Sequence, residues 1–98
     1  MDNDMITYIV LWNFTDQGAR NIKLTTERAD VFRAQAEELG VTVKDYYWTL
    51  GGYDGVIILE APDDEKVARL ILMTCSLGTV RAQALRAFAR VEIDRILS

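Results

Sequence analysis

Residues 51–62 have the sequence Gly-Gly-Tyr-Asp-Gly-Val-Ile-Ile-Leu-Glu-Ala-Pro. Three glycines around a Tyr-Asp pair are typical of a tight turn, because glycine adopts positive φ without strain and aspartate hydrogen-bonds to nearby backbone. An apolar, β-branched run follows immediately, so the turn leads into a buried strand. Residues 41–49 are also strand-like, and the two segments together predict a β-hairpin.

Outward from this hairpin, the chain predicts strands over residues 6–13, 41–50, 53–60 and 79–88, and helices over 26–39, 64–77 and 90–97. Thr15 or Asp16 is expected to cap a short helical turn, Thr26 to cap the main helix, and Gly40 to end it. The order predicts an α+β fold, the ferredoxin-like βαββαβ plait, with a short C-terminal helix. Both main helices then cover one face of an antiparallel sheet, in a single domain over residues 1–98.

The main helix has an apolar stripe at Ala29, Phe32, Ala36 and Leu39, with the spacing of one helix face. We expect its charged side chains, including Arg28, to occupy the opposite, solvent-facing surface.

The strands are apolar on both sides, which the predicted plait does not by itself explain. Ile9 and Leu11 alternate with Tyr8, Val10 and Trp12, and residues 56–59 are all aliphatic. A solvated sheet face should instead alternate with polar residues. An uncovered apolar sheet is an association surface, so we expect two sheets to pack face to face as a dimeric α/β barrel.

Composition narrows the possible functions. The 98 residues carry a net charge of −4 and no histidine, which excludes Ser-His-Asp and Cys-His pairs and the usual zinc sites. We expect no metal and no cofactor, and without a basic run no nucleic-acid partner. The apolar runs are too short to span a membrane, the acidic start at 1–4 is unlike a signal peptide, and the single Cys75 excludes an internal disulfide. The expected location is cytoplasmic.

The chain resembles the GYD-domain family, which is named for the triplet at 52–54. The resemblance extends over residues 8–11, 14–23, 28–29, 47–51, 60–64, 78–81 and 85–88. It implies a small bacterial or archaeal ferredoxin-like protein, from a family without a settled activity. The chain departs from the family pattern at Ala82 and Ala84, where threonine is common.

A weaker similarity links the hairpin and fold to the effector-binding domains of leucine-responsive regulators, which pair through their sheets and bind small effectors between subunits. Cofactor-free monooxygenases and muconolactone-isomerase-like proteins share the dimeric barrel. Both are analogies of fold, and function has to be argued from the site.

The candidate ligand-binding residues are Tyr8, Trp48, Tyr53, Asp54 and Arg81. Asp54 is either a carboxylate at the mouth of an inter-subunit cleft or a group that fixes the hairpin through backbone N–H groups. Arg81 is either a carboxylate receptor or a structural charge, with Asp54 as its natural partner. The aromatic residues either line a pocket or form core and dimer contacts.

Three functions remain open. The first is a homo-oligomeric binding or regulatory module that holds a small organic ligand between subunits. The second is a cofactor-independent enzyme of the dimeric-barrel type, a monooxygenase or an isomerase, and the third is a purely structural assembly unit. The first predicts that the chain's main partner is a second copy of itself.

Overall fold

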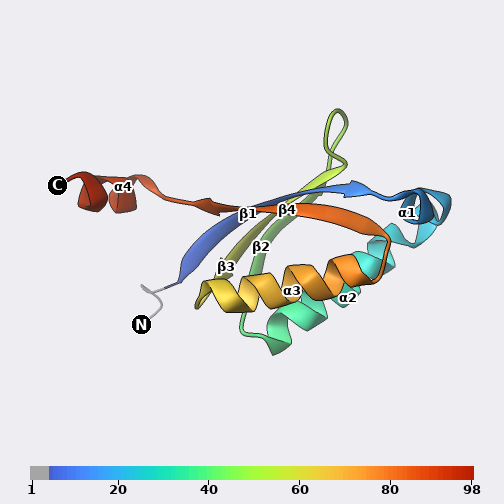
Figure 1. The fold of residues 1–98 in the computed structure, drawn as a ribbon, viewed down its shortest axis with the longest axis horizontal. Helices are drawn as coiled ribbons and strands as arrows, with labels where there is room; N and C mark the ends of the chain where they lie inside the picture. The colour runs from blue at the N-terminus through green and yellow to red at the C-terminus, as the bar shows by residue number, and fades with distance from the viewer. Residues whose placement is uncertain (1–4) are drawn as a thin grey trace.

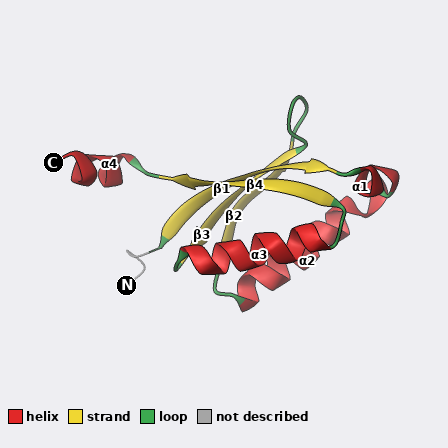
Figure 2. Cartoon of the chain, viewed as in Figure 1, coloured by secondary structure: helices red, strands yellow, loops and turns green. Residues whose placement is uncertain are grey.

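The computed structural model describes residues 5–98, so the acidic start at residues 1–4 lies outside the described part. Its elements are β1 (Ile6–Phe14), α1 (Asp16–Arg20), the 3-10 helix η2 (Ile22–Leu24), α2 (Thr25–Glu38), β2 (Thr42–Trp48), β3 (Gly55–Ala61), α3 (Asp64–Ser76), β4 (Val80–Ala87) and α4 (Arg90–Leu97). Figures 1 and 2 show a curved sheet with α2 and α3 along one side.

The four strands form one sheet in the order β2-β3-β1-β4, and every neighbouring pair is antiparallel. This is the topology of the predicted βαββαβ plait, and the fold prediction is confirmed. Because α2 and α3 both lie on the same side, the other side of the sheet has no helix over it within residues 5–98 (Figure 1).

The predicted elements are all present, and most of their ends differ from the prediction by one or two residues. Thr15 caps α1 by accepting from the Gly18 N–H at 3.2 Å, and Gly40 follows α2 at a φ of 75°. The prediction that Thr26 caps the main helix is wrong. Helix α2 starts at Thr25 as a direct continuation of η2, its N-cap is Leu24, and no side chain provides a cap.

The core lies between the sheet and the two helices. Alternate side chains of β1 and β3, among them Val10 and Leu59, pack against Phe32 of α2 and Leu70 of α3, and each is at most 5% exposed. Burying one such side chain contributes about 1.5–3 kcal/mol. The apolar surfaces of the helix layer and of one sheet face are therefore buried against each other within the chain.

Gly55 is required by a close approach to this core. It pairs with Trp12 across β1 and β3, and a Cβ atom at Gly55 would lie 2.1 Å from the Trp12 ring. The ring cannot swing away, because it is 3% exposed and packs edge-on against Phe14 and Trp48.

We therefore expect Gly55→Ala to destabilise the fold by about 1–3 kcal/mol, the usual cost of overpacking a core. For a domain of this size this is a fall in melting temperature of at least about 4 °C. Gly52→Ala is the matched control, because a Cβ atom there meets nothing within 4 Å. Equal melting temperatures for the two variants, measured by circular dichroism, would contradict the packing of Trp12 on Gly55.

Candidate functional site

The sheet face opposite the helices carries a continuous apolar strip, which we call the open face. Along β1 and β3, Ile9 lies beside Ile58 and Leu11 beside Val56. Their alternate neighbours point to the helices. The four side chains are half-buried by one another, and Leu85 of β4 continues the strip at 40% exposure.

The hairpin turn lies at one end of the open face, and Asp54 holds it to β1. Its carboxylate accepts a hydrogen bond from the Phe14 N–H at 2.9 Å, and its own N–H donates to the Trp12 carbonyl at 2.9 Å. The carboxylate thus takes the place of a strand carbonyl where the chain leaves the ladder. Asp54 therefore fixes the hairpin through a backbone N–H group, as the structural interpretation predicts. That N–H group belongs to β1 rather than to the turn itself.

Tyr53 and Arg81 lie at the same end. The Tyr53 hydroxyl donates to the Gln83 side chain at 3.2 Å, and Arg81 pairs in register with Asn13. Asn13 in turn donates to the Gly52 carbonyl at 3.0 Å. Within residues 5–98 no ion pair joins Arg81 to Asp54, and Arg81 is exposed. Both charged groups therefore lie at the hairpin end of the open face without pairing with each other.

Tyr8 and Trp48 lie on the helix side instead. The Tyr8 hydroxyl donates to Asp64 at the start of α3 at 2.6 Å, and this hydrogen bond raises the pKa of Tyr8. The Trp48 indole N–H donates to Thr25 of α2 at 3.0 Å. The five candidate residues therefore do not form one cluster, and they do not line a single ligand site.

The aromatic residues divide in the same way. Trp12, Tyr46 and Trp48 pack together, with Tyr46 and Trp48 ring centroids 4.9 Å apart, whereas Tyr47 faces the other side of the sheet. Burial raises the pKa of Tyr46 to about 12, so this phenol stays neutral at ordinary pH.

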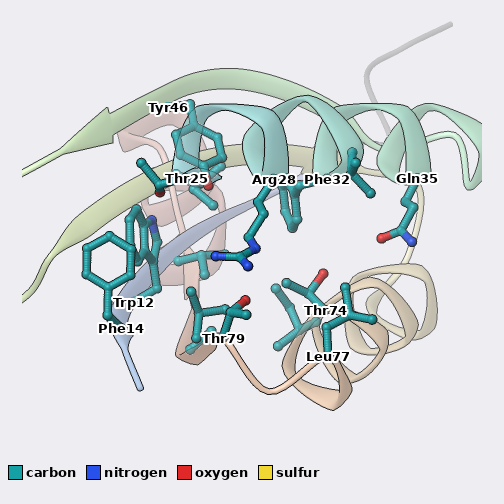
Figure 3. Close-up of a pocket in the computed structure, with 16 residues that line it drawn as sticks. Trp12, Phe14, Thr25, Arg28, Phe32, Gln35, Tyr46, Thr74, Leu77 and Thr79 are labelled. Atoms are coloured by element: carbon teal, nitrogen blue, oxygen red, sulfur yellow. The ribbon is translucent and has the colours of Figure 1, made fainter. Parts of the chain in front are cut away.

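A cavity of about 160 Å³ lies on the helix side, between α2, α3 and the sheet, and no single motif of the sequence predicts it. Trp12 and Phe14 form one wall, and Leu77 lies at the other side (Figure 3). The expectation that Arg28 faces solvent is wrong, because its side chain extends from α2 into this cavity and is half-buried. The signal in the sequence is a polar stripe at Thr25, Arg28 and Gln35, beside the apolar stripe of α2.

Neither a metal centre nor a membrane span is found in the described part of the chain. Within residues 5–98, no group of three or more metal-ligating side chains could hold an ion. No helix in that range has the length and apolarity needed to cross a membrane.

The fold and the hairpin define a ferredoxin-like α+β domain with one uncovered sheet face. The family model of the GYD domain matches residues 8–97. The chain belongs to this family, as the resemblance implied.

The chain is similar to a curated bacterial protein and to a solved structure. A Thermus thermophilus protein, named as a glutamine synthetase and cystathionine beta-lyase binding protein, is 39% identical over 84 residues, 85% of this chain and 88% of that protein. The crystal structure of MtbAldR, a regulator of the Lrp/AsnC family, matches with a TM-score of 0.62 at 15% identity. This match covers 88% of the chain but only 55% of MtbAldR, so the chain spans about half of that protein and shares its fold.

The hydrogen bond from Phe14 to Asp54 predicts a graded effect of substitution. Asp54→Ala removes the acceptor and should cost on the order of 1 kcal/mol, whereas Asp54→Asn keeps a carbonyl oxygen in place and most of the stability. Asp30→Ala is the control, since Asp30 is an exposed aspartate on α2. Chemical denaturation of the three variants measures the effect, and an Asp54→Ala variant as stable as Asp30→Ala would contradict it.

Proposed function

We propose that the chain is a homo-oligomeric regulatory module that pairs through its open face and holds a small ligand between subunits. The observation that carries this proposal is the strip formed by Ile9, Leu11, Val56 and Ile58, which no helix within residues 5–98 covers. Apolar surface of this kind is removed from water when a second sheet packs on it. The fold shared with MtbAldR supports the proposal at the level of architecture only.

The ligand site is proposed at the hairpin end of the open face. The Arg81 guanidinium is exposed there, and its fork of donors matches a carboxylate. One carboxylate oxygen of Asp54 is held by Phe14, and the other is available to an ammonium group. This combination fits a small molecule with both charges, such as a free amino acid. Asp54→Asn should keep the fold while weakening the rise in melting temperature that such a ligand produces.

The partner class is proposed from the Thermus relative, whose name describes a protein that binds two enzymes. The similarity supports a binding or regulatory role for this chain as well. We propose that the chain binds a metabolic enzyme, glutamine synthetase being the first candidate. The two alternatives are a cofactor-independent enzyme and a purely structural assembly unit. A barrel that binds neither a ligand nor a partner would favour the assembly unit.

The pairing is tested by placing a charge in the centre of the strip. Ile58→Asp should dissociate the oligomer, because burying an unpaired charge costs on the order of 3–5 kcal/mol. Leu72→Asp is the matched control, as Leu72 is 70% exposed on α3 and faces away from the sheet. Sedimentation velocity at micromolar concentration should show an assembly for the unmodified chain and for Leu72→Asp, and a monomer for Ile58→Asp. A monomeric unmodified chain would refute the proposal.

The partner is tested with purified glutamine synthetase from the same organism. Biolayer interferometry should show saturable binding to the immobilised chain, with binding lost in Ile58→Asp and kept in Leu72→Asp if the assembly presents the binding surface. Loss in both variants would point to misfolding, which circular dichroism detects. Absence of binding to the unmodified chain would reject this enzyme as the partner and leave the pairing proposal intact.

A further inference from the structure

The cavity on the helix side is separate from the open face, because the sheet lies between them. Its walls are mostly apolar side chains of the sheet and of the two helices, among them Trp12, Phe32 and Ile71. An apolar cavity of about 150 Å³ is large enough to bind a benzene-sized molecule. The volume of about 160 Å³ therefore admits one small ring or one branched aliphatic chain.

One charge faces this space. Among the described residues, Arg28 is the only charged one in the cavity wall, and Figure 3 shows its guanidinium inside the cavity. Its one protein hydrogen bond among residues 5–98 is a long one, 3.4 Å to the Asn21 carbonyl, and no ion pair involves it there. A guanidinium has five N–H donors, so most of its binding capacity remains free.

The Trp12 indole belongs to the same wall, but its ring nitrogen is covered by protein atoms. The Trp12 indole N–H is buried and makes no hydrogen bond within residues 5–98. The nitrogen lies over Gly55 of β3, where a Cβ atom would be 2.5 Å from it, so Arg28 is the donor that is open to the cavity. The remaining polar groups, Thr25, Gln35, Thr74 and Thr79, are neutral, and Tyr46 stays protonated because burial raises its pKa to about 12. The cavity is thus apolar with a single net positive charge.

We propose that this cavity binds a small apolar monocarboxylate, with the carboxylate on Arg28 and the hydrocarbon against Trp12 and Phe32. The charge selects an anion, since a carboxylate and a guanidinium form two parallel charge-assisted hydrogen bonds. The cavity volume limits this anion to a small molecule. Net burial of the hydrocarbon supplies affinity, and the ion pair supplies discrimination against neutral and cationic analogues. This site lies within one subunit and does not depend on the pairing proposed above.

Benzoate is the probe, with benzamide as its neutral isostere and benzylamine as its cationic analogue. Binding is followed by the fluorescence of the two tryptophans, one of which lines the cavity, and located by amide chemical-shift changes. We expect saturable benzoate binding, with benzamide at least about tenfold weaker, as the loss of a charged hydrogen bond implies. Shift changes should concentrate in α2, α3 and the facing strands.

Variants decide the role of each part. Arg28→Gln should reduce benzoate affinity to that of benzamide, whereas Arg69→Gln, an exposed arginine on α3, should leave it unchanged. Ala82→Leu fills the cavity from β4 and should abolish binding of both probes while the fold is retained. The proposal is overturned if benzoate does not bind, if Arg28→Gln binds it as well as the unmodified chain, or if the shifts map to the open face. Benzoate binding by monomeric Ile58→Asp separates this site from the inter-subunit one.

Discussion

The contact between the Trp12 indole and Gly55 is the constraint on which the rest of the structure depends. The ring lies where a side chain on the opposite strand would otherwise be, so a side chain at position 55 would strain the pairing of β1 and β3 in this register. Once held there, the indole organises Phe14, Tyr46 and Trp48 around it. The same ring is a wall of the helix-side cavity. One glycine thus links the hairpin, the aromatic cluster and the cavity.

A second close approach at a glycine determines the junction between β1 and β4. The Thr15 hydroxyl accepts from the Gly18 N–H and donates to the Gly78 carbonyl at 2.5 Å. A Cβ atom at Gly18 would lie 2.0 Å from the Thr79 carbonyl oxygen, so α1 can approach β4 only with glycine there. These residues belong to the segments that carry the family resemblance. Their arrangement gives that resemblance a structural meaning that is independent of any ligand.

Much of the fold follows from the sequence because its signals are local. Turn glycines and the apolar stripe of α2 each act within a few residues, and each lies where expected. The apolar strands also predicted an uncovered face. The sides on which Tyr8, Trp48 and Arg28 lie are less predictable, since they depend on long-range contacts. In β2, a register irregularity between Val43 and Asp45 breaks simple alternation. The direction of the Arg28 side chain depends on the gap between two helices, and no single segment of the sequence determines that gap.

The two faces of the sheet meet at residues 12–14 of β1. Trp12 and Phe14 line the cavity, whereas Asn13 between them faces the hairpin end of the open face. Asp54 bonds to the backbone of both neighbours, accepting from Phe14 and donating to Trp12. Coupling between the two sites requires an element with two arrangements that both ligands bias, and it is reciprocal in binding free energy. Because Asp54 holds β1 through two hydrogen bonds, we expect the two sites to bind their ligands independently. Occupancy of one site changes the affinity of the other only if the Asp54 contacts to β1 rearrange.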